Sequence, residues 1–277
     1  MKRIKIVGLC LIVAGAFAAI AGASSAVAAP EWGVCVSAKK AVYANSSCTE
    51  VALKKGKPSH KGDFEWHGAD ECYAMKKGNF TEPGCKTVAE KKGAPDHKGS
   101  YELAPSPTYT STTGTATLKS ALGSITCTSS VDEGAVTGPT SDKDSVQFFG
   151  CSTLGQTCLN TVIEGKPSIA TEVLPTTLGE SAGKVVNTFG DGPSGYSAIF
   201  ACENVGYFRT SGSTCGTVEP LNVMGTESTT NFEAESACQK LVTEYSAEPT
   251  FSEPVTVPAE EITIGRDVTS TAIEAKS

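Results

Sequence analysis

The sequence has few histidines, and all three lie in its first hundred residues. His60, His67 and His97 are the whole set in a chain of 277 residues, so residues 104–277 contain none. This excludes a Ser-His-Asp or Cys-His nucleophilic site within that part, because no histidine is available as the base. The H-E-x-x-H, C-x-x-C and P-loop motifs are also absent. No catalytic residue, metal site or cofactor is therefore expected from motifs.

Positive charge is also scarce in the larger part of the chain. Residues 104–277 hold eight lysines and arginines against twenty acidic residues, a net charge of −12, whereas residues 29–103 hold twelve lysines against ten acidic residues, a net charge of +2. This contrast predicts two parts of different character. It also disfavours nucleic acid as a partner, because neither part is strongly basic.

The first 28 residues have the pattern of a secretory signal peptide. Three positive charges precede an apolar run over residues 6–23, and Ala26 and Ala28 form the A-x-A pattern that precedes cleavage. We expect the mature chain to begin at Ala29. No second apolar run of membrane length follows, so we expect a secreted or cell-surface protein with no membrane contact after cleavage.

Cysteine is abundant. Of eleven cysteines only Cys10 precedes Ala29, which leaves an even number. Ten cysteines in a chain with a signal peptide predict disulfides and an oxidising compartment.

Residues 29–103 contain an internal repeat. At an offset of 37 residues, 14 of 33 positions from Val34 to Trp66 are identical, without a gap. This predicts a duplicated module with copies at about 34–66 and 71–103, each too small to fold without a staple. Each copy has two cysteines, so the simplest pairing is Cys35 with Cys48 and Cys72 with Cys85, although cross-pairing between copies stays open.

Each copy is expected to be a short β-unit. Aromatic residues, a polar turn and a Lys-Gly-Pro loop follow one another in both copies. A helical alternative stays open for residues 49–55 and 86–92, each of which precedes a glycine.

The rest of the chain is expected to be all-β. Residues 104–115 hold Pro105, Pro107 and several Ser and Thr, which predicts a linker. From 116 to 265, short segments rich in Thr, Val, Ile and aromatics alternate with turn residues, which predicts a sandwich or barrel. Residues 266–277 are expected to be a frayed tail. The overall fold class is therefore mainly β, a small disulfide-stapled module followed by an all-β domain.

Six cysteines lie in this domain and allow fifteen pairings. Cys151 and Cys158 could close a loop across a turn, and Cys127 and Cys202 lie in strand-like segments that could face each other. That arrangement would leave Cys215 to pair with Cys238.

Several short pieces of this domain occur in a characteristic order. They are Ile125–Ser130, Gly138–Pro139, Phe149–Cys151, Thr177–Gly179, Phe200–Cys202 and Pro220–Met224. In this order they resemble a group of uncharacterised secreted proteins from high-GC Gram-positive bacteria, and the repeat resembles a cysteine-containing Lys-Gly-rich unit that accompanies such proteins. The resemblance implies a secreted β-rich protein and transfers no catalytic residue.

The lysine clusters of the repeat are the best candidate for binding. Lysine pairs stand at equivalent positions of the two copies, with aromatic residues later in each copy; the candidate residues are Lys54, Lys55, Trp66, Lys91, Lys92 and Tyr101. Lysines pair with phosphate or carboxylate and aromatic faces stack on sugars. We therefore expect a non-catalytic surface or envelope protein that binds an anionic cell-wall polymer or glycan.

Four other interpretations stay open. An extracellular glycan hydrolase would need two carboxylates, for which Glu203, Glu219, Glu233 and Glu235 are available. An inhibitor-like role would suit small disulfide-dense units. Asp142 and Asp144 could bind calcium, and His60 and His97 could share a metal, but solvated turns are the simpler interpretation of both pairs.

Overall fold

The structure is a computed structural model, and it describes residues 29–277. The predicted signal peptide and Cys10 lie outside the described residues. Within them the chain is all-β, as the sequence predicted, and contains no helix. The described part of the chain thus offers no helix long and apolar enough to cross a membrane.

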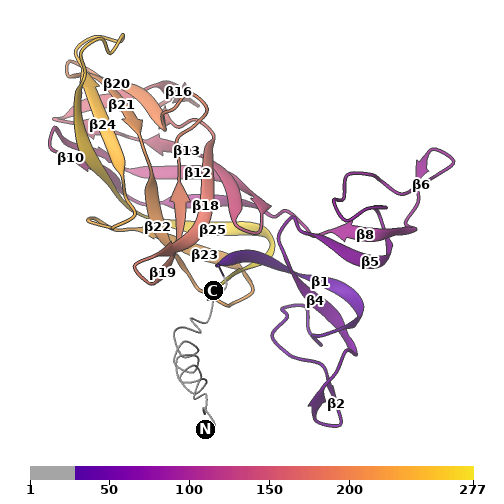
Figure 1. The fold of residues 1–277 in the computed structure, drawn as a ribbon. Helices are drawn as coiled ribbons and strands as arrows, with labels where there is room; N and C mark the ends of the chain where they lie inside the picture. Colours follow the sequence, from indigo (N-terminus) through magenta and orange to yellow (C-terminus); the bar gives the residue numbers. More distant parts are fainter. Residues whose placement is uncertain (1–28) are drawn as a thin grey trace, which may run out of the picture.

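Eight antiparallel strands form a closed barrel (Figure 1). In order around the barrel they are β9 (Thr108–Thr113), β12 (Ser129–Gly138), β13 (Ser141–Phe149), β18 (Leu174–Ser181), β19 (Lys184–Phe189), β22 (Thr214–Glu219), β23 (Gly225–Phe232) and β25 (Val255–Lys276). The last strand, β25, pairs with both β23 and β9, and this pairing closes the ring.

A second circuit of antiparallel ladders continues from the first and shares β25. Its other members are β10 (Ala116–Ser120), β11 (Gly123–Cys127), β14 (Ser152–Thr153), β15 (Gln156–Leu159), β20 (Ala198–Cys202), β21 (Gly206–Ser211) and β24 (Leu241–Ser246). A hairpin of β16 (Thr161–Ile163) and β17 (Lys166–Ala170) attaches to β13. Because β25 is 22 residues long, its first part belongs to the second circuit and its middle to the barrel.

Alternation along the strands places one set of side chains inside. In β18, Leu174, Thr176 and Leu178 are buried, and the two residues that alternate with them are exposed. Threonine suits both faces of such a strand because its branched side chain fits the pleated sheet, which explains a barrel built from a Ser/Thr-rich sequence.

Two N-terminal units precede the barrel. The first unit, residues 31–68, pairs β1 (Glu31–Ala41) with β4 (Gly62–Gly68) and carries the hairpin β2 (Leu53–Lys54) and β3 (Lys57–Pro58). The second unit, residues 72–103, pairs β5 (Cys72–Gly78) with β8 (Gly99–Leu103) and carries β6 (Glu90–Lys91) and β7 (Ala94–Pro95). Both units project from one end of the barrel (Figure 1).

The same contacts recur in both units at the 37-residue offset. Tyr43 bridges to Phe64 as Phe80 bridges to Tyr101, and a glycine packs against the Tyr43 carbonyl in the first unit and against the Phe80 carbonyl in the second. The two segments for which a helix stayed open form turns and short strands instead. That the units arose by duplication stays a prediction of the sequence.

The first unit is anchored to the barrel. Trp32 and Gly33 of β1 pair with the end of β25, and Trp32 and Val34 belong to a core cluster with Val218 and Ile273 of barrel strands. The ring of Trp66 lies over Gly33. The first unit therefore caps one end of the barrel.

Two predicted boundaries were wrong. The linker expected at residues 104–115 contains β9, and the frayed tail expected at 266–277 is the end of β25. The physical reason is the same for both. From Tyr109 to Thr113, β9 pairs with β25, which closes the barrel and leaves neither segment free. The two prolines of the expected linker stand just before β9, where they remove no ladder hydrogen bond.

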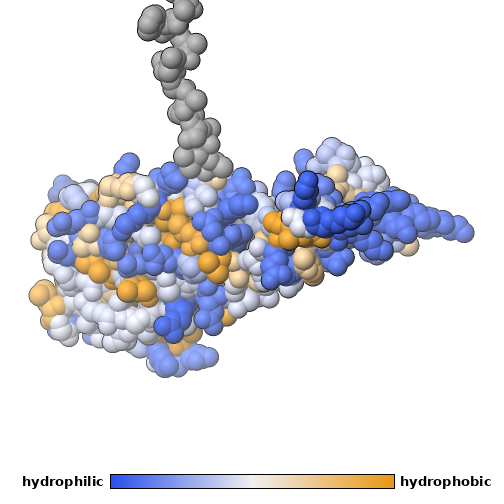
Figure 2. All heavy atoms as spheres, turned by 90° about the horizontal axis from the view of Figure 1, so that it is seen from below, coloured by the Kyte–Doolittle hydropathy of each residue, from blue (hydrophilic) through white to orange (hydrophobic). Residues whose placement is uncertain are grey.

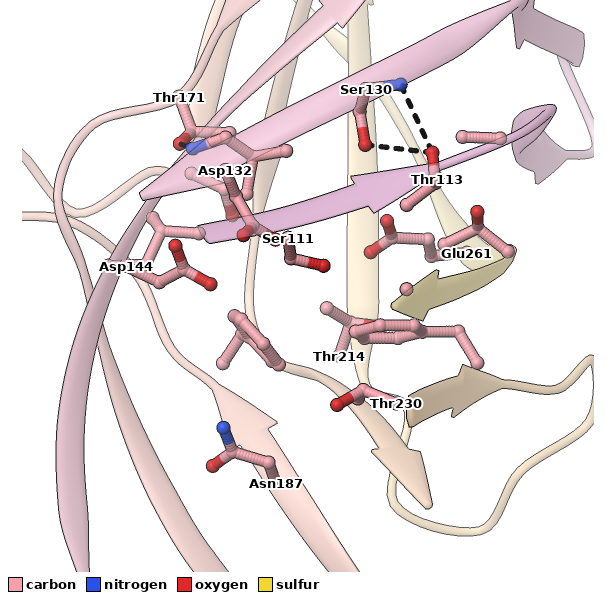
Figure 3. A pocket seen from close by; sticks show the side chains of 18 of the residues that line it. Ser111, Thr113, Ser130, Asp132, Asp144, Thr171, Asn187, Thr214, Thr230 and Glu261 are labelled. Atoms are coloured by element: carbon pink, nitrogen blue, oxygen red, sulfur yellow. Dashed lines mark hydrogen bonds between the residues drawn. The ribbon is translucent and has the colours of Figure 1, made fainter. Parts of the chain in front are cut away.

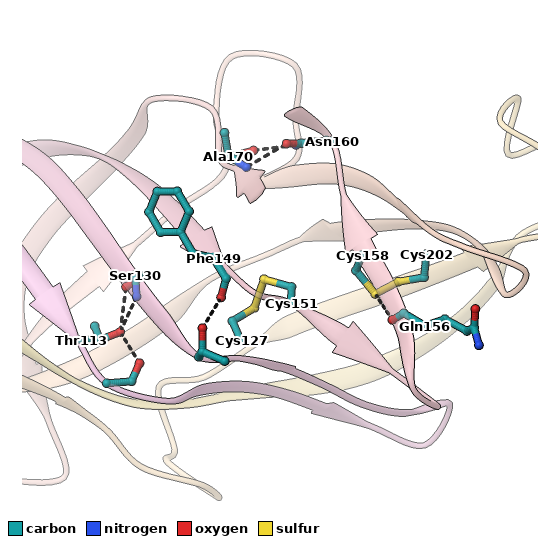
Figure 4. Close-up of a disulfide and its surroundings, with 12 residues drawn as sticks. Thr113, Cys127, Ser130, Phe149, Cys151, Gln156, Cys158, Asn160, Ala170 and Cys202 are labelled. Atoms are coloured by element: carbon teal, nitrogen blue, oxygen red, sulfur yellow. Dashed lines mark hydrogen bonds between the residues drawn. A yellow bond between two sulfur atoms is a disulfide. The ribbon is translucent and has the colours of Figure 1, made fainter. Parts of the chain in front are cut away.

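Five disulfides connect the ten described cysteines. Cys35–Cys48, Cys72–Cys85 and Cys215–Cys238 agree with the pairing that the sequence favoured. The other two, Cys127–Cys151 and Cys158–Cys202, correct the expectation that Cys127 would pair with Cys202 and Cys151 with Cys158 (Figure 4).

Strand order explains the correction. Cys158 of β15 stands directly opposite Cys202 of β20 in their ladder. Cys127 ends β11, whose Thr126 pairs with Ser152, the residue after Cys151. The turn that was expected to bring Cys151 to Cys158 is instead a β-hairpin, and its two ends are tied to different neighbours.

Candidate functional site

The lysine pairs of the two units lie at the tips of matching hairpins. In the first unit Lys54 pairs with Lys57 across a turn at Lys55 and Gly56, and both turn residues have positive φ. In the second unit the turn consists of Lys92 and Gly93, again with positive φ. All of these lysines are exposed.

None of the hairpin lysines is neutralised within the described part of the chain. The ion pairs there involve other lysines, Lys98 with Asp96 and Lys184 with Glu233, besides one arginine and one histidine pair. The four candidate lysines, Lys54, Lys55, Lys91 and Lys92, therefore present free ammonium groups to solvent. Figure 2 shows the surface of the projecting units as mostly hydrophilic, with a smaller apolar patch.

The aromatic candidates do not share these tips. Trp66 belongs to β4 opposite Cys35, and the ammonium group of Lys276 lies 4.3 Å from the centroid of its ring. The indole nitrogen of Trp66 is buried without a hydrogen-bond partner. Tyr101 is half-buried and bridges to Phe80. These two aromatic side chains therefore stabilise the units, and only the lysines remain as a surface site.

The barrel holds a second candidate site that the sequence analysis missed. A cavity of about 150 Å³ lies inside it and continues beneath strands of the second circuit, and five acidic side chains from three strands line this cavity. Figure 3 labels three of them, Asp132, Asp144 and Glu261. They are Asp132 of β12, Asp142 and Asp144 of β13, and Glu261 and Asp267 of β25. No lysine, arginine or histidine of the described residues lines it.

Some of the carboxyl oxygens have hydrogen-bond donors and some have none. Asp142 Oδ2 accepts from the Tyr109 hydroxyl at 2.9 Å and from Asn187 Nδ2 at 3.0 Å. Asp267 Oδ2 accepts from Thr230 Oγ1 at 3.0 Å. The Oδ1 atoms of three aspartates are buried without a partner, those of Asp132, Asp142 and Asp144.

Burial raises the pKa of every one of these acids, because a charged carboxylate loses its hydration inside the barrel. The pKa of Asp144 rises to about 9, with repulsion from Asp132 and Asp142 adding to the burial. The pKa of Asp132 rises to about 7, with repulsion from Asp267 as the next cause, and burial raises the pKa of Glu261 to about 7. The pKa values of Asp142 and Asp267 are raised for the same main reason.

The remaining lining is largely apolar. Phe148, Ile169, Phe189, Phe200 and Phe232 line the cavity together with hydroxyl groups of Ser and Thr. At the end next to the first unit the lining includes Trp32. The cavity is therefore amphipathic: it has aromatic walls and a set of five acidic side chains, which we call the acidic belt (Asp132, Asp142, Asp144, Glu261 and Asp267).

The sequence already indicated that two of these five acids lie close together. Asp142 and Asp144 are two residues apart, so they lie on one face of any strand that contains both. The solvated turn expected for this pair is wrong, because β13 includes both residues and its pairing with β12 turns both side chains into the barrel, where they are buried.

The other carboxylates and histidines of the sequence lie outside this cavity. The four glutamates considered for hydrolysis, Glu203, Glu219, Glu233 and Glu235, are all exposed. His60 and His97 are exposed on the two units, as expected for solvated turns. Within residues 29–277 no group of three or more His, Cys, Asp or Glu side chains is arranged to hold a metal ion.

Comparison with known proteins does not narrow the range of possible functions. No family model, curated protein or solved structure matches the chain. The two candidate sites, the lysine hairpins and the acidic cavity, therefore carry the functional argument.

Proposed function

We propose that this is a secreted, non-catalytic protein of the cell envelope that binds an anionic polymer, or a glycan bearing phosphate or carboxylate groups, through its two lysine hairpins. The observation that carries the proposal is the recurrence of exposed, unpaired lysines at both hairpin tips, at equivalent positions of two units that project from the same end of the barrel. The five disulfides are compatible with an extracellular protein.

The charge distribution favours contact through the tips. The two units carry a net +2, while the barrel sequence carries −12. A polyanion is therefore repelled by the barrel and attracted by the units. Because exposed lysines remain hydrated, each contact is weak and sensitive to salt.

Two tips compensate for weak single contacts. A polymer that engages one hairpin is held near the other, so the second contact forms at a high effective concentration. Each unit is also held by a disulfide, Cys35–Cys48 in the first and Cys72–Cys85 in the second. This lowers the conformational entropy that binding would otherwise cost.

The test is co-sedimentation of the oxidised chain from Ala29 to Ser277 with purified bacterial cell-wall material at low and moderate salt. One variant replaces Lys54, Lys55, Lys91 and Lys92 by Gln. The matched control makes the same change in charge outside the two units, at the exposed Lys119, Lys143, Lys166 and Lys240 of residues 104–277.

We expect salt-sensitive pelleting of the parent chain and of the matched control, and loss of pelleting in the hairpin variant. Equal pelleting of both variants would show that the hairpins have no special role and overturn the proposal. Failure of the parent chain to pellet at low salt would overturn it too.

A further inference from the structure

The interior of the barrel contains acidic groups without any positive partner. Asp142 is 4% exposed and Asp144 is 2% exposed, and the carboxyl groups of Asp132, Glu261 and Asp267 line the same cavity. A barrel interior is normally filled by apolar side chains or by polar groups that satisfy one another. Buried acids without a cation are costly, and such costs are typical of functional sites.

Other polar groups in the belt are equally unsatisfied. The hydroxyl of Ser111 lines the cavity and is 1% exposed; it lies near the carboxyl groups of Asp132 and Asp267 without making a well-formed hydrogen bond to either. The amide oxygen of Asn187 lines the cavity without a hydrogen-bond partner, and the hydroxyl of Thr214 lies near Glu261 without making a well-formed bond to it. Figure 3 shows Ser111, Asp144 and Asn187 arranged around the central space.

The unpartnered atoms indicate the polarity of a ligand. Hydroxyl groups can donate or accept, and the one unpartnered atom among the described cavity-lining residues that can only donate is the indole nitrogen of Trp32, at the end of the cavity. The amide oxygen of Asn187 is an acceptor, and the free oxygens of Asp132, Asp142 and Asp144 are acceptors when these acids are ionised. The ligand that satisfies this belt is therefore a hydrogen-bond donor.

A metal ion does not fit this acceptor set. No three of the acidic groups are arranged as metal ligands in the described part of the chain, whereas hard cations require several oxygen ligands around one point. A group that carries several N–H donors at once fits better, because it can reach acceptors that are spread along a belt.

The size and the walls of the cavity define the rest of the ligand. A cavity of about 150 Å³ is close to that of an engineered protein cavity that binds benzene. Phe148, Phe189, Phe200 and Phe232 line it, and aromatic walls of this kind bind an apolar body by area burial and aromatic contact.

We propose that the barrel interior binds one small organic cation, an ammonium group joined to an apolar part about the size of a benzene ring. The ammonium group donates to the free oxygens of the acidic belt, and the apolar part occupies the space between the aromatic walls. This function is independent of polymer binding by the lysine hairpins.

Ligand binding is linked to the protonation of the cavity. The titratable groups that face it are Tyr109 of β9, Asp132 of β12, Asp142 and Asp144 of β13, and Glu261 and Asp267 of β25; β18, β19, β22 and β23 contribute none. Their raised pKa values keep part of these acids protonated near neutrality. A carboxylic acid that pairs with an incoming ammonium ion loses its proton to the solvent, so binding releases protons and weakens as the pH falls.

The experiment is calorimetric titration of the oxidised chain from Ala29 to Ser277 with benzylamine at about pH 7, where Asp144 is protonated and Asp132 is partly protonated. Benzyl alcohol, which has nearly the same shape and no charge, is the comparison ligand. Repeating the titration in buffers of different ionisation enthalpy measures proton release.

The variants are Asp132→Asn and Asp144→Asn, which keep the shape of the side chain and remove its charge. The matched control is Glu133→Gln, which lies between Asp132 and Gly134 on β12 but is exposed on the outside of the barrel. Thermal unfolding of each variant shows whether it is folded. In a Trp66→Phe background the only remaining tryptophan is Trp32, and because Trp32 lines the cavity, its fluorescence reports ligand inside the barrel.

We expect benzylamine to bind with proton release, benzyl alcohol to bind at least about tenfold more weakly, and both Asn variants to lose at least about tenfold in affinity while Glu133→Gln is unchanged. No benzylamine binding, equal binding of benzyl alcohol, or unchanged binding in folded Asn variants would each overturn the proposal. Binding without a change in Trp32 fluorescence would place the ligand outside the barrel and overturn it as well.

Discussion

The Tyr109 hydroxyl donates a hydrogen bond of 2.9 Å to Asp142 Oδ2 inside the barrel. The two residues lie on β9 and β13, which are separated by β12, so this bond spans three strands of the ring. The ring of Tyr109 passes over Gly134 of β12, where any side chain would collide with it. A sequence segment expected to be a linker therefore supplies a structural contact to the acidic belt.

Replacing Tyr109 by Phe removes this donor and leaves Asp142 Oδ2 with one bond, from Asn187. We expect a loss of about 1–3 kcal/mol in the free energy of unfolding, because a buried acceptor loses a partner. Urea unfolding measures it. Tyr207→Phe is the control, since Tyr207 is half-buried and its hydroxyl makes no side-chain hydrogen bond among residues 29–277; similar losses in both variants would contradict the role of the bond.

The stability of the empty barrel should depend on the charge of its interior acids. The pKa values of Asp132 and Asp144 are raised to about 7 and about 9 in the folded state, while both are near 4 in an unfolded chain. The folded state thus binds more protons, and the contribution of these groups to stability falls as the pH rises from about 4 to about 9.

Asp144→Asn removes one of these groups, so its stability relative to the parent chain should increase with pH over that range. Urea midpoints at about pH 5, 7 and 9 measure the difference. Glu133→Gln should run parallel to the parent chain. A difference between Asp144→Asn and the parent chain that is constant with pH would show that Asp144 is charged throughout.

Gly62 and Gly99 should be equally intolerant of a side chain. A Cβ atom on either would overlap a backbone carbonyl, that of Tyr43 or of Phe80. We expect Gly62→Ala and Gly99→Ala each to lower the stability of its own unit by about 1–3 kcal/mol. Faster proteolysis within that unit would detect the loss. Gly114→Ala is the control, since nothing lies within 4 Å of its Cβ position; an equal effect there would contradict the packing argument.

The disulfide pattern can be checked by mass spectrometry of peptides from the unreduced protein. We expect Cys127 linked to Cys151 and Cys158 linked to Cys202. Replacing both members of a pair by Ala should cost about 4 kcal/mol for Cys158–Cys202, whose ends are 44 residues apart, and about 3.5 kcal/mol for Cys127–Cys151, which are 24 apart. Peptides linking Cys127 to Cys202 would contradict the strand order of the second circuit.

Local patterns predicted the parts of the molecule that local forces form. The all-β class follows from Thr, Val and aromatic segments between turns, and the pairings Cys35–Cys48 and Cys72–Cys85 follow from a 37-residue offset that gives each copy two cysteines. The exposed Lys-Gly hairpin tips are local as well, because Gly56 and Gly93 permit the positive φ of a tight turn.

Contacts between distant segments could not be predicted in this way. Whether residues 266–277 fray or close the barrel depends on their pairing with β9, which lies about 150 residues earlier in the sequence. No local sequence pattern identifies the two strands as partners. The partners of Cys127 and Cys158 depend on the same strand order.

The sequence by itself determined the all-β class, the internal repeat and the sites of positive charge, and it favoured one disulfide within each unit, because these depend on neighbours within about 40 residues. Only the tertiary structure decided that Asp132, Asp144 and Asp267 share one cavity. A strand's alternation divides its residues between two faces, but which face is inside is settled when the ring closes and one face is turned to water and the other to the interior.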